Sequence, residues 1–271
     1  EKVRLVFADV GNEHQSTYDY VLDYLPQALG IPVTVVRADF SGEFARKRMF
    51  VARDQRTRRD NGRRVRWTNR AKRRALAALH PSGNPYLDLC MLKGIFPSRK
   101  AQFCTERLKT EPLVEYQLGL IAAGYTVCSW QGVRADESPR RALLPQDEDR
   151  GGGLTIHRPI LSWTAQQCVD YVRSKGLVLN PLYAQGSSRV GCMPCINSSK
   201  ADLSNIAERW PSEIARIAEW ERIVGQASKR SESTFIAAVD GARGERQGSG
   251  IEAVIQWART SRGGKQIPLA L

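Results

Sequence analysis

Short apolar and β-branched runs alternate with longer amphipathic stretches through most of the chain. The runs lie at residues 3–10, 32–38, 125–133 and 155–161, and the amphipathic stretches at 16–29, 112–123 and 164–175. Because strands that alternate with helices form parallel sheets with crossover connections, this order predicts an α/β fold, doubly wound around a mainly parallel sheet. Ser16 is the expected N-cap of the first helix, with Asp19 as the acid of a capping box.

Two segments depart from this alternation. Residues 43–80 read as a basic helical insertion with a break at Asn61-Gly62, and residues 201–271 as a C-terminal helical extension to a main domain at 1–200. In the extension Pro211 begins a second helix, whose expected core stripe is Ile214, Ile217, Trp220 and Val224. We expect Gly151–Gly153 to be a flexible connection, and SRGGKQ (261–266) to be a tail and not a phosphate loop.

The sequence contains no apolar run near the roughly 18 residues of a membrane span and opens with no charged-then-apolar leader, which favours the cytoplasm and no membrane partner. The first residue is Glu1, not Met, and a strand pattern follows at once. We therefore expect the natural chain to begin earlier.

Nearly all of the net charge of +13 is concentrated in one segment. Residues 45–74 contain fourteen Lys or Arg and two Asp, a net charge of +12. A block of one sign repels itself, so the segment predicts a polyanionic partner such as nucleic acid. A large phosphate-rich substrate or a charged lid would also account for it. Trp67 is either a base-stacking residue or a packing anchor.

Polar side chains follow the strand patterns, where ligands of such sheets bind. Asp9 and Gly11 follow the first strand, although Asp-x-Gly is also ordinary turn chemistry. Arg134, Arg140 and Arg141 follow the later strand, with Glu137 between them. Forked guanidinium donors suit phosphate or sulfate, and a surface group of ion pairs is the alternative.

Six cysteines are too few for a secreted disulfide scaffold of this length. Cys128 and Cys168 lie in strand and helix patterns and are expected to be inert core. Cys90 and Cys104 lie in a segment that reads as irregular (80–109), and Cys192 and Cys195 complete a set of four. Four thiolates suit zinc or a four-iron cluster, and Cys192-Met193-Pro194-Cys195 alone would suffice for a redox pair. The spacing favours a metal site.

The motifs FADVGNEH, FCTERLKTEPL, GVRADESPRR, NPLY and GCMPC occur in the order found in the PAPS reductase family, the adenine nucleotide alpha hydrolases of ATP pyrophosphatase type. The chain most resembles phage-type members, over nearly all of residues 1–200. This resemblance implies a doubly wound domain that binds ATP or an adenylylated sulfate. It also implies that Asp9 and Gly11 flank the nucleotide, and that Arg134, Glu137 and Arg141 face its phosphate or sulfate end. Glu137 and Arg134 are the candidate catalytic residues.

GCMPC is similar to the paired-cysteine half of the 4Fe-4S site in adenosine 5'-phosphosulfate reductases, and Cys104 to the first member of that family's tandem pair. Thr105 replaces the second member, so Cys90 is the candidate fourth ligand beside Cys104, Cys192 and Cys195. No cysteine follows Cys195, whereas sulfonucleotide reductases use a C-terminal one. The family's SGGxDS phosphate loop belongs just before the strand at which this sequence begins.

The resemblance leads to a first hypothesis: an iron-sulfur sulfur-transfer enzyme that adenylates an acceptor, with nucleic acid bound by the arm at 45–74 as a candidate acceptor. The second hypothesis is a sulfonucleotide reductase that uses an external thiol or sulfur donor protein. A zinc-stabilised nucleic acid binder without catalysis is the third.

Overall fold

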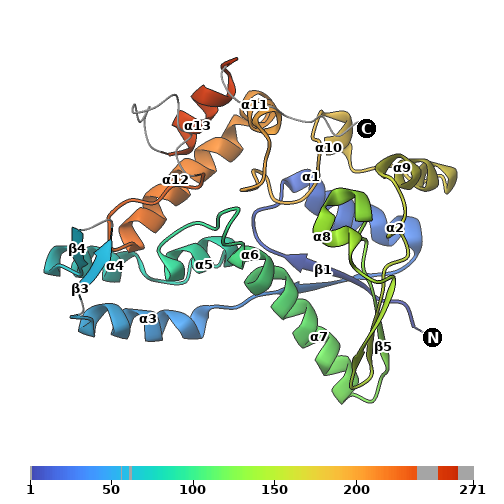
Figure 1. Ribbon diagram of the computed structural model, residues 1–271, viewed down its shortest axis with the longest axis horizontal. Helices are drawn as coiled ribbons and strands as arrows, with labels where there is room; N and C mark the ends of the chain where they lie inside the picture. Colours follow the sequence, from blue (N-terminus) through green and yellow to red (C-terminus); the bar gives the residue numbers. More distant parts are fainter. Residues whose placement is uncertain (1, 56, 61–62, 237–249, 262–271) are drawn as a thin grey trace.

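The computed structural model describes residues 2–55, 57–60, 63–236 and 250–261 (Figure 1). Its strands form a parallel pair, an antiparallel hairpin and a three-stranded mixed sheet. The strands are β1 (Leu5–Asp9), β2 (Val33–Arg37), β3 (Thr57–Asp60), β4 (Arg63–Arg66), β5 (Val127–Trp130), β6 (Asp147–Gly151) and β7 (Leu154–His157). The α/β class with parallel strand pairs is confirmed.

The first parallel pair sets the position of the candidate site. β1 and β2 pair from Leu5↔Val33 to Asp9↔Arg37, so both strands end at the same edge. A helical crossover of α1 (Gln15–Tyr18), a π-helical segment (Asp19–Tyr24) and α2 (Leu25–Leu29) joins them. The Ser16 cap prediction is wrong: the imidazole Nδ1 of His14 is the cap and accepts from the Ser16 amide at 3.1 Å.

The second sheet has the strand order β5-β7-β6, with β5 and β7 parallel and β6 and β7 antiparallel. Gly151–Gly153 were expected to be a flexible connection. Instead Gly151 ends β6, Gly152 and Gly153 form the turn to β7, and all three have positive φ. Cys128, expected in the core, is exposed because its side of β5 is not covered, and Cys168 is only half-buried. Helix α7 (Glu111–Ala122) contacts β1, β2 and β5 and so links the two sheets.

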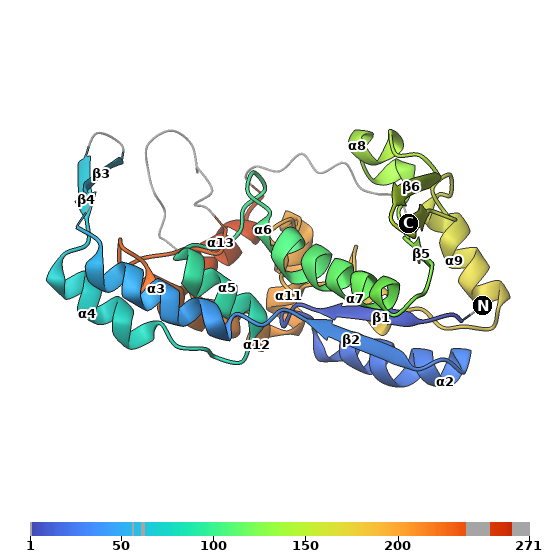
Figure 2. The ribbon, with the colours of Figure 1, turned by 90° about the horizontal axis from the view of Figure 1, so that it is seen from below.

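The basic insertion is helical only at its two ends. Helices α3 (Ser41–Arg53) and α4 (Asn69–Ala78) flank an antiparallel hairpin, β3-β4, in which Asp60 pairs with Arg63. Figure 2 shows this hairpin at the far end of the molecule from β5. The expectation of helix is therefore wrong for residues 57–60 and 63–66. The predicted break at Asn61-Gly62 lies outside the described residues.

The C-terminal helices pack on the insertion and on α5 (Pro85–Lys93). Helix α12 (Pro211–Ala227) buries Ile214, Ile217, Trp220 and Val224, which confirms the predicted stripe. The ring of Trp220 stacks on the ring of Tyr86 in α5, with the two ring centres 5.7 Å apart. The extension therefore shares one hydrophobic core with α5, while the domain boundary at 200 stays a prediction.

The other short elements connect these parts. They are a short α6 (Phe103–Thr105) followed by a π-helical segment (Glu106–Thr110), a 3-10 turn (Ala135–Glu137), α8 (Pro139–Ala142), α9 (Ala165–Ser174), α10 (Pro181–Ala184), α11 (Lys200–Arg209) and α13 (Ile251–Ala258). Within the described ranges, no helix combines the length and apolarity needed to cross a bilayer. All but the first residue of SRGGKQ lies outside them.

Candidate functional site

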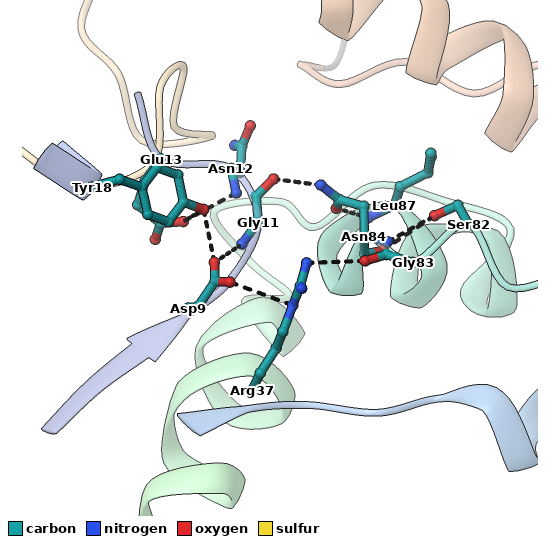
Figure 3. Close-up of polar contacts among 10 residues, drawn as sticks. All are labelled: Asp9, Gly11, Asn12, Glu13, Tyr18, Arg37, Ser82, Gly83, Asn84 and Leu87. Atoms are coloured by element: carbon teal, nitrogen blue, oxygen red, sulfur yellow. Dashed lines mark hydrogen bonds and ion pairs between the residues drawn. The ribbon is translucent and has the colours of Figure 1, made fainter. Parts of the chain in front are cut away.

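Asp9 organises the loop that follows β1 (Figure 3). Its Oδ1 accepts a 2.8 Å hydrogen bond from the Gly11 amide and a 2.7 Å hydrogen bond from the Tyr18 hydroxyl. Its Oδ2 lies 3.4 Å from Nε of Arg37, the residue opposite it on β2. The carboxylate thus holds the loop to α1 and to the neighbouring strand, and its own two oxygens are engaged in doing so.

Gly11 lies against the start of the helix that carries Cys90. It has φ of +76°, and its carbonyl oxygen accepts a 2.7 Å hydrogen bond from the Asn84 amide nitrogen. A Cβ at this position would lie 2.9 Å from both the Asn84 side chain and Cδ of Pro85. Asn84 is the N-cap of α5, accepting from the Leu87 amide. Only glycine therefore combines this backbone conformation with this close approach.

Asn12 and Glu13 join the same loop to the Cys192–Cys195 segment. The Met193 amide donates to the Asn12 carbonyl at 2.7 Å, and the Asn12 side chain donates to the Pro194 carbonyl at 3.0 Å. Glu13 forms a β-bridge with Cys192. Asn12 is fully buried, so these bonds form away from water. The strand-end loop and the paired cysteines are thus one unit.

The four predicted ligand cysteines share one hydrophobic core: Cys90 lies within it, and Cys104, Cys192 and Cys195 pack against it. Their thiols all interact electrostatically with the buried Tyr86 hydroxyl, and with one another in several pairs; they are Cys90, Cys104, Cys192 and Cys195. The expectation that Cys90 lies in an irregular segment is wrong, because it is 1% exposed in the middle of α5. Cys104 lies in α6, and the other two in the loop before α11.

Burial favours the protonated form of three of these thiols when nothing is bound to them. Burial and the nearby Cys104 raise the pKa of Cys90 well above its ordinary value, and burial raises the pKa of Cys104. Burial raises the pKa of Cys192 to about 12, although Lys109 acts to lower it. A bound cation reverses this balance because it favours thiolates.

Several groups here stabilise negative charge on sulfur. Burial raises the pKa values of Cys104, Cys192 and Glu13, and the positive charge of Lys109 acts to lower all three. Hydrogen bonds from Thr105 act on Cys104 in the same direction. The Asn197 amide donates to the Cys195 sulfur at 3.5 Å. Four thiols with such donors fit a group ligated by thiolates.

The described residues show no site for a metal ion at these cysteines. Over the ranges that the structure describes, no three His, Cys, Asp or Glu side chains form a group that could hold one ion. A four-iron cluster takes one thiolate at each iron, so its sulfur ligands stand farther apart than those around one zinc ion. The donor set is thus compatible with a cluster, while the ligand assignment stays a prediction.

Arg134, Glu137 and Arg141 form a second charged group beyond β5. Glu137 pairs with Arg141 and lies 3.6 Å from Nη1 of Arg134, whose Nε lies 3.0 Å from Asp136. Figure 2 shows α8, which carries Arg141, well apart from α2. The carboxylates hold the guanidiniums in place, as the sequence suggested, but the group does not join the Asp9 loop in this conformation. Arg140 lies beside it on the exposed surface.

Some site residues were not found by sequence reasoning. Asn12 lies inside FADVGNEH without a role that the motif makes evident, while Tyr86 and Arg216 lie outside the motifs. The partners of Asn12 and Arg216 lie far away in the chain. Arg216, for example, bonds to Asn12 across 204 positions. Glu13 and Lys109 lie inside FADVGNEH and FCTERLKTEPL, so these motifs were the available signal.

The comparisons with known proteins agree with this geometry. The phosphoadenosine phosphosulfate reductase domain matches residues 1–198. The chain belongs to the phosphoadenosine phosphosulfate reductase family. A 37.8 kDa protein of Escherichia phage 186 is 45% identical over 278 residues, which cover 97% of this chain and 83% of the relative.

Other relatives are adenosine 5'-phosphosulfate reductases. The one from Allochromatium vinosum is 32% identical over 137 residues, 49% of this chain and 51% of that enzyme. The one from Streptomyces coelicolor is 36% identical over 116 residues, 41% of this chain and 45% of that enzyme. The chain thus spans about half the length of these reductases.

Proposed function

We propose that this family member transfers sulfur to an acceptor that it first activates with ATP, and that an iron-sulfur cluster bound by Cys90, Cys104, Cys192 and Cys195 takes part. The observation that carries the proposal is that these four cysteines pack in or against one core, beside the loop that ends β1. Such loops at strand ends are where α/β sheets bind nucleotides.

The residues of the chain have separate roles in this proposal. Gly11 lets the loop backbone approach the nucleotide, and Asp9 fixes the loop by its bonds to Gly11 and Tyr18. The four thiolates would bind a 4Fe-4S cluster, which when present supplies a site to hold sulfur or exchange electrons. Lys109 offsets the negative charge that collects on Cys104 and Cys192.

Arg134 and Arg141, oriented by Glu137, would bind the phosphates. An acceptor oxygen attacks the α-phosphorus of ATP. The bond between this phosphorus and the oxygen that bridges to the β-phosphate breaks, and pyrophosphate leaves. A nucleophile at the sulfide level then displaces AMP, so the acceptor oxygen leaves with the phosphate and a carbon-sulfur or phosphorus-sulfur bond replaces it. Arg134 and Arg141 stabilise the charge that develops on phosphate, and Glu137 holds them in position.

A second candidate is a sulfonucleotide reductase that uses an external thiol. The adenosine 5'-phosphosulfate reductase relatives favour it. The thiolate of a partner would attack the sulfate sulfur, release the nucleotide and form a thiosulfonate; a second thiol would then release sulfite and leave a disulfide. In this candidate the attacking thiol comes from a partner such as a thioredoxin.

Iron and acid-labile sulfide content after anaerobic purification tests the ligand set. Serine would replace Cys90, Cys104, Cys192 and Cys195 singly, with Cys128→Ser and Cys168→Ser as matched controls. Each of the four ligand variants should lose most of the iron. The two controls should retain it, because Cys128 is exposed and neither Cys128 nor Cys168 belongs to the four cysteines that act on Tyr86. Retention of a complete cluster by Cys192→Ser or Cys195→Ser would overturn the assignment.

The reaction class needs a separate measurement. Pyrophosphate release from ATP that depends on added acceptor supports sulfur transfer, whereas sulfite release from adenylylated sulfate with thioredoxin supports the reductase. A protein that binds zinc in place of iron and shows neither activity would instead be the non-catalytic nucleic acid binder.

A further inference from the structure

Helix α3 carries an exposed face that combines basic and apolar side chains. Arg46, Met49, Phe50 and Arg53 are spaced by three or four residues, so they lie on one side of the helix. Met49 is 48% exposed and Phe50 43% exposed, which is unusual for a helix that also buries Phe44 and Val51. These four residues and the adjoining Asp54 and Gln55 line an open hollow of about 550 Å³.

Other cations of the same segment have structural tasks. The guanidinium of Arg48 donates to the carbonyl of Leu79 at 3.2 Å, and Nζ of Lys72 donates to the carbonyl of Ala52 at 2.9 Å. Arg74 donates to the carbonyl of Ser228 at 2.7 Å. These bonds tie α3, α4 and α12 together. Arg46 and Arg53, by contrast, lie exposed beside the hollow.

The face begins close to the thiol site and leads away from it. Glu43, in the first turn of α3, pairs with Arg107, which lies two positions before Lys109 and over the ring of Phe40. From there α3 extends over its 13 residues, about 20 Å at the usual rise per residue, toward the β3-β4 hairpin (Figure 2). Residues 45–74 concentrate a net charge of +12 along this path.

We propose that this face of α3 binds a single-stranded nucleic acid, with an unpaired base on Met49 and Phe50 and the flanking phosphates on Arg46 and Arg53. This inference deepens the proposed function, since it names the class of acceptor. The charge favours a polyanion, and the apolar hollow favours one with exposed base faces. A duplex offers phosphates but keeps its bases stacked inside, so it presents no base face to the apolar side chains of the hollow. Lys47, whose Nζ lies 5.7 Å from the Phe50 ring centre, adds charge beside the base.

Fluorescence anisotropy with the full chain tests this site. The probes are a 12-nucleotide DNA strand, an RNA strand of the same sequence, and the DNA duplex, each measured over a series of salt concentrations. Phe50→Leu should weaken binding of a single strand about five- to hundredfold, the usual effect of losing a stacking side chain. Phe50→Trp should restore it. The doubly substituted Arg46→Gln/Arg53→Gln should lower the logarithmic salt slope by about 1.4, from about 0.7 for each neutralised contact.

Arg173→Gln/Lys175→Gln on α9 is the matched control, because it removes two exposed charges far from the hollow. Whichever of the DNA and RNA strands binds with the higher affinity identifies the type of acceptor. Equal affinity for the duplex, or unchanged affinity in Phe50→Leu, would overturn the inference. Iron content and pyrophosphate release are measured on the same variants. If the wild type holds iron and releases pyrophosphate but binds none of the strands, only this inference fails and the proposed function stands.

Discussion

The guanidinium of Arg216 donates a 2.8 Å hydrogen bond to the side-chain oxygen of the fully buried Asn12. It also donates to the carbonyl of Met193 at 2.7 Å and packs over the Trp220 ring. One side chain of α12 thus holds both the loop after β1 and the loop of Cys192 and Cys195. The C-terminal helices therefore support the site directly.

Replacing Arg216 with alanine should loosen this connection. The change leaves the Asn12 and Met193 oxygens without their donor, at a cost of about 1–3 kcal/mol in the free energy of unfolding. Denaturant titration measures the loss, and a faster release of bound metal to a chelator would report the loosened loop. Arg222→Ala, which removes an exposed ion pair with Glu219 on the same helix, should change neither. Equal effects of the two variants would show that Arg216 has no special role.

Gly11→Ala should be more damaging than the same change at Gly30. Both glycines have positive φ, +76° and +65°, so both variants incur the left-handed backbone penalty of about 1–2 kcal/mol. Only at Gly11 would the new methyl group also collide with Asn84 and Pro85, whereas the space at Gly30 is open. Thermal denaturation of the two variants isolates the collision, and nucleotide binding should weaken only in Gly11→Ala. Equal melting temperatures would contradict the close packing.

Asp202 should make part of the stability depend on pH. Burial acts to raise the pKa of its carboxyl, but hydrogen bonds from Ser199 and Ser188 outweigh this and lower it. The folded protein therefore binds this proton less readily than the unfolded chain. Its contribution is complete above the ordinary value near 3.8 and is lost as the pH falls below it.

The variant Asp202→Asn tests this sign. It should lose about 1.5–3 kcal/mol of unfolding free energy at neutral pH, because bonds to a charged acceptor are lost. Its stability should also fall less than that of the wild type between pH 5 and about 3. Urea denaturation across that range gives the comparison. A constant difference between the two proteins would mean that Asp202 does not titrate as described.

The hairpin gives a prediction that is independent of α3. Arg58, Arg59, Arg63 and Arg64 lie on β3 and β4, and replacing all four with glutamine should lower the salt slope for a single strand by about 3. The matched control replaces Arg150, Arg173, Lys175 and Arg209, which are exposed elsewhere. An unchanged slope in the hairpin variant would remove the hairpin from the binding surface.

Features set by neighbouring residues could be predicted from the sequence. The period of the apolar residues fixed β1, β2, α9 and the buried stripe of α12, because such patterns depend on which side of one element faces the core. The strand-end position of Asp9 and Gly11 followed in the same way. Errors arose where a local pattern is compatible with two kinds of secondary structure. At residues 57–60 and 63–66, for example, the arginine-rich sequence suits either a helix or a hairpin.

Only the tertiary structure decided which distant residues meet. The packing of Cys104, Cys192 and Cys195 against the core that contains Cys90 is such a case. The helix around Cys90 was missed, although Asn84-Pro85 and Gly94 are typical of its two ends. The bonds that Asn12 makes to Pro194 and Arg216 span 182 and 204 positions. Sequence periodicity carries no information about such contacts, because they depend on how whole elements pack and not on the pattern within any one of them.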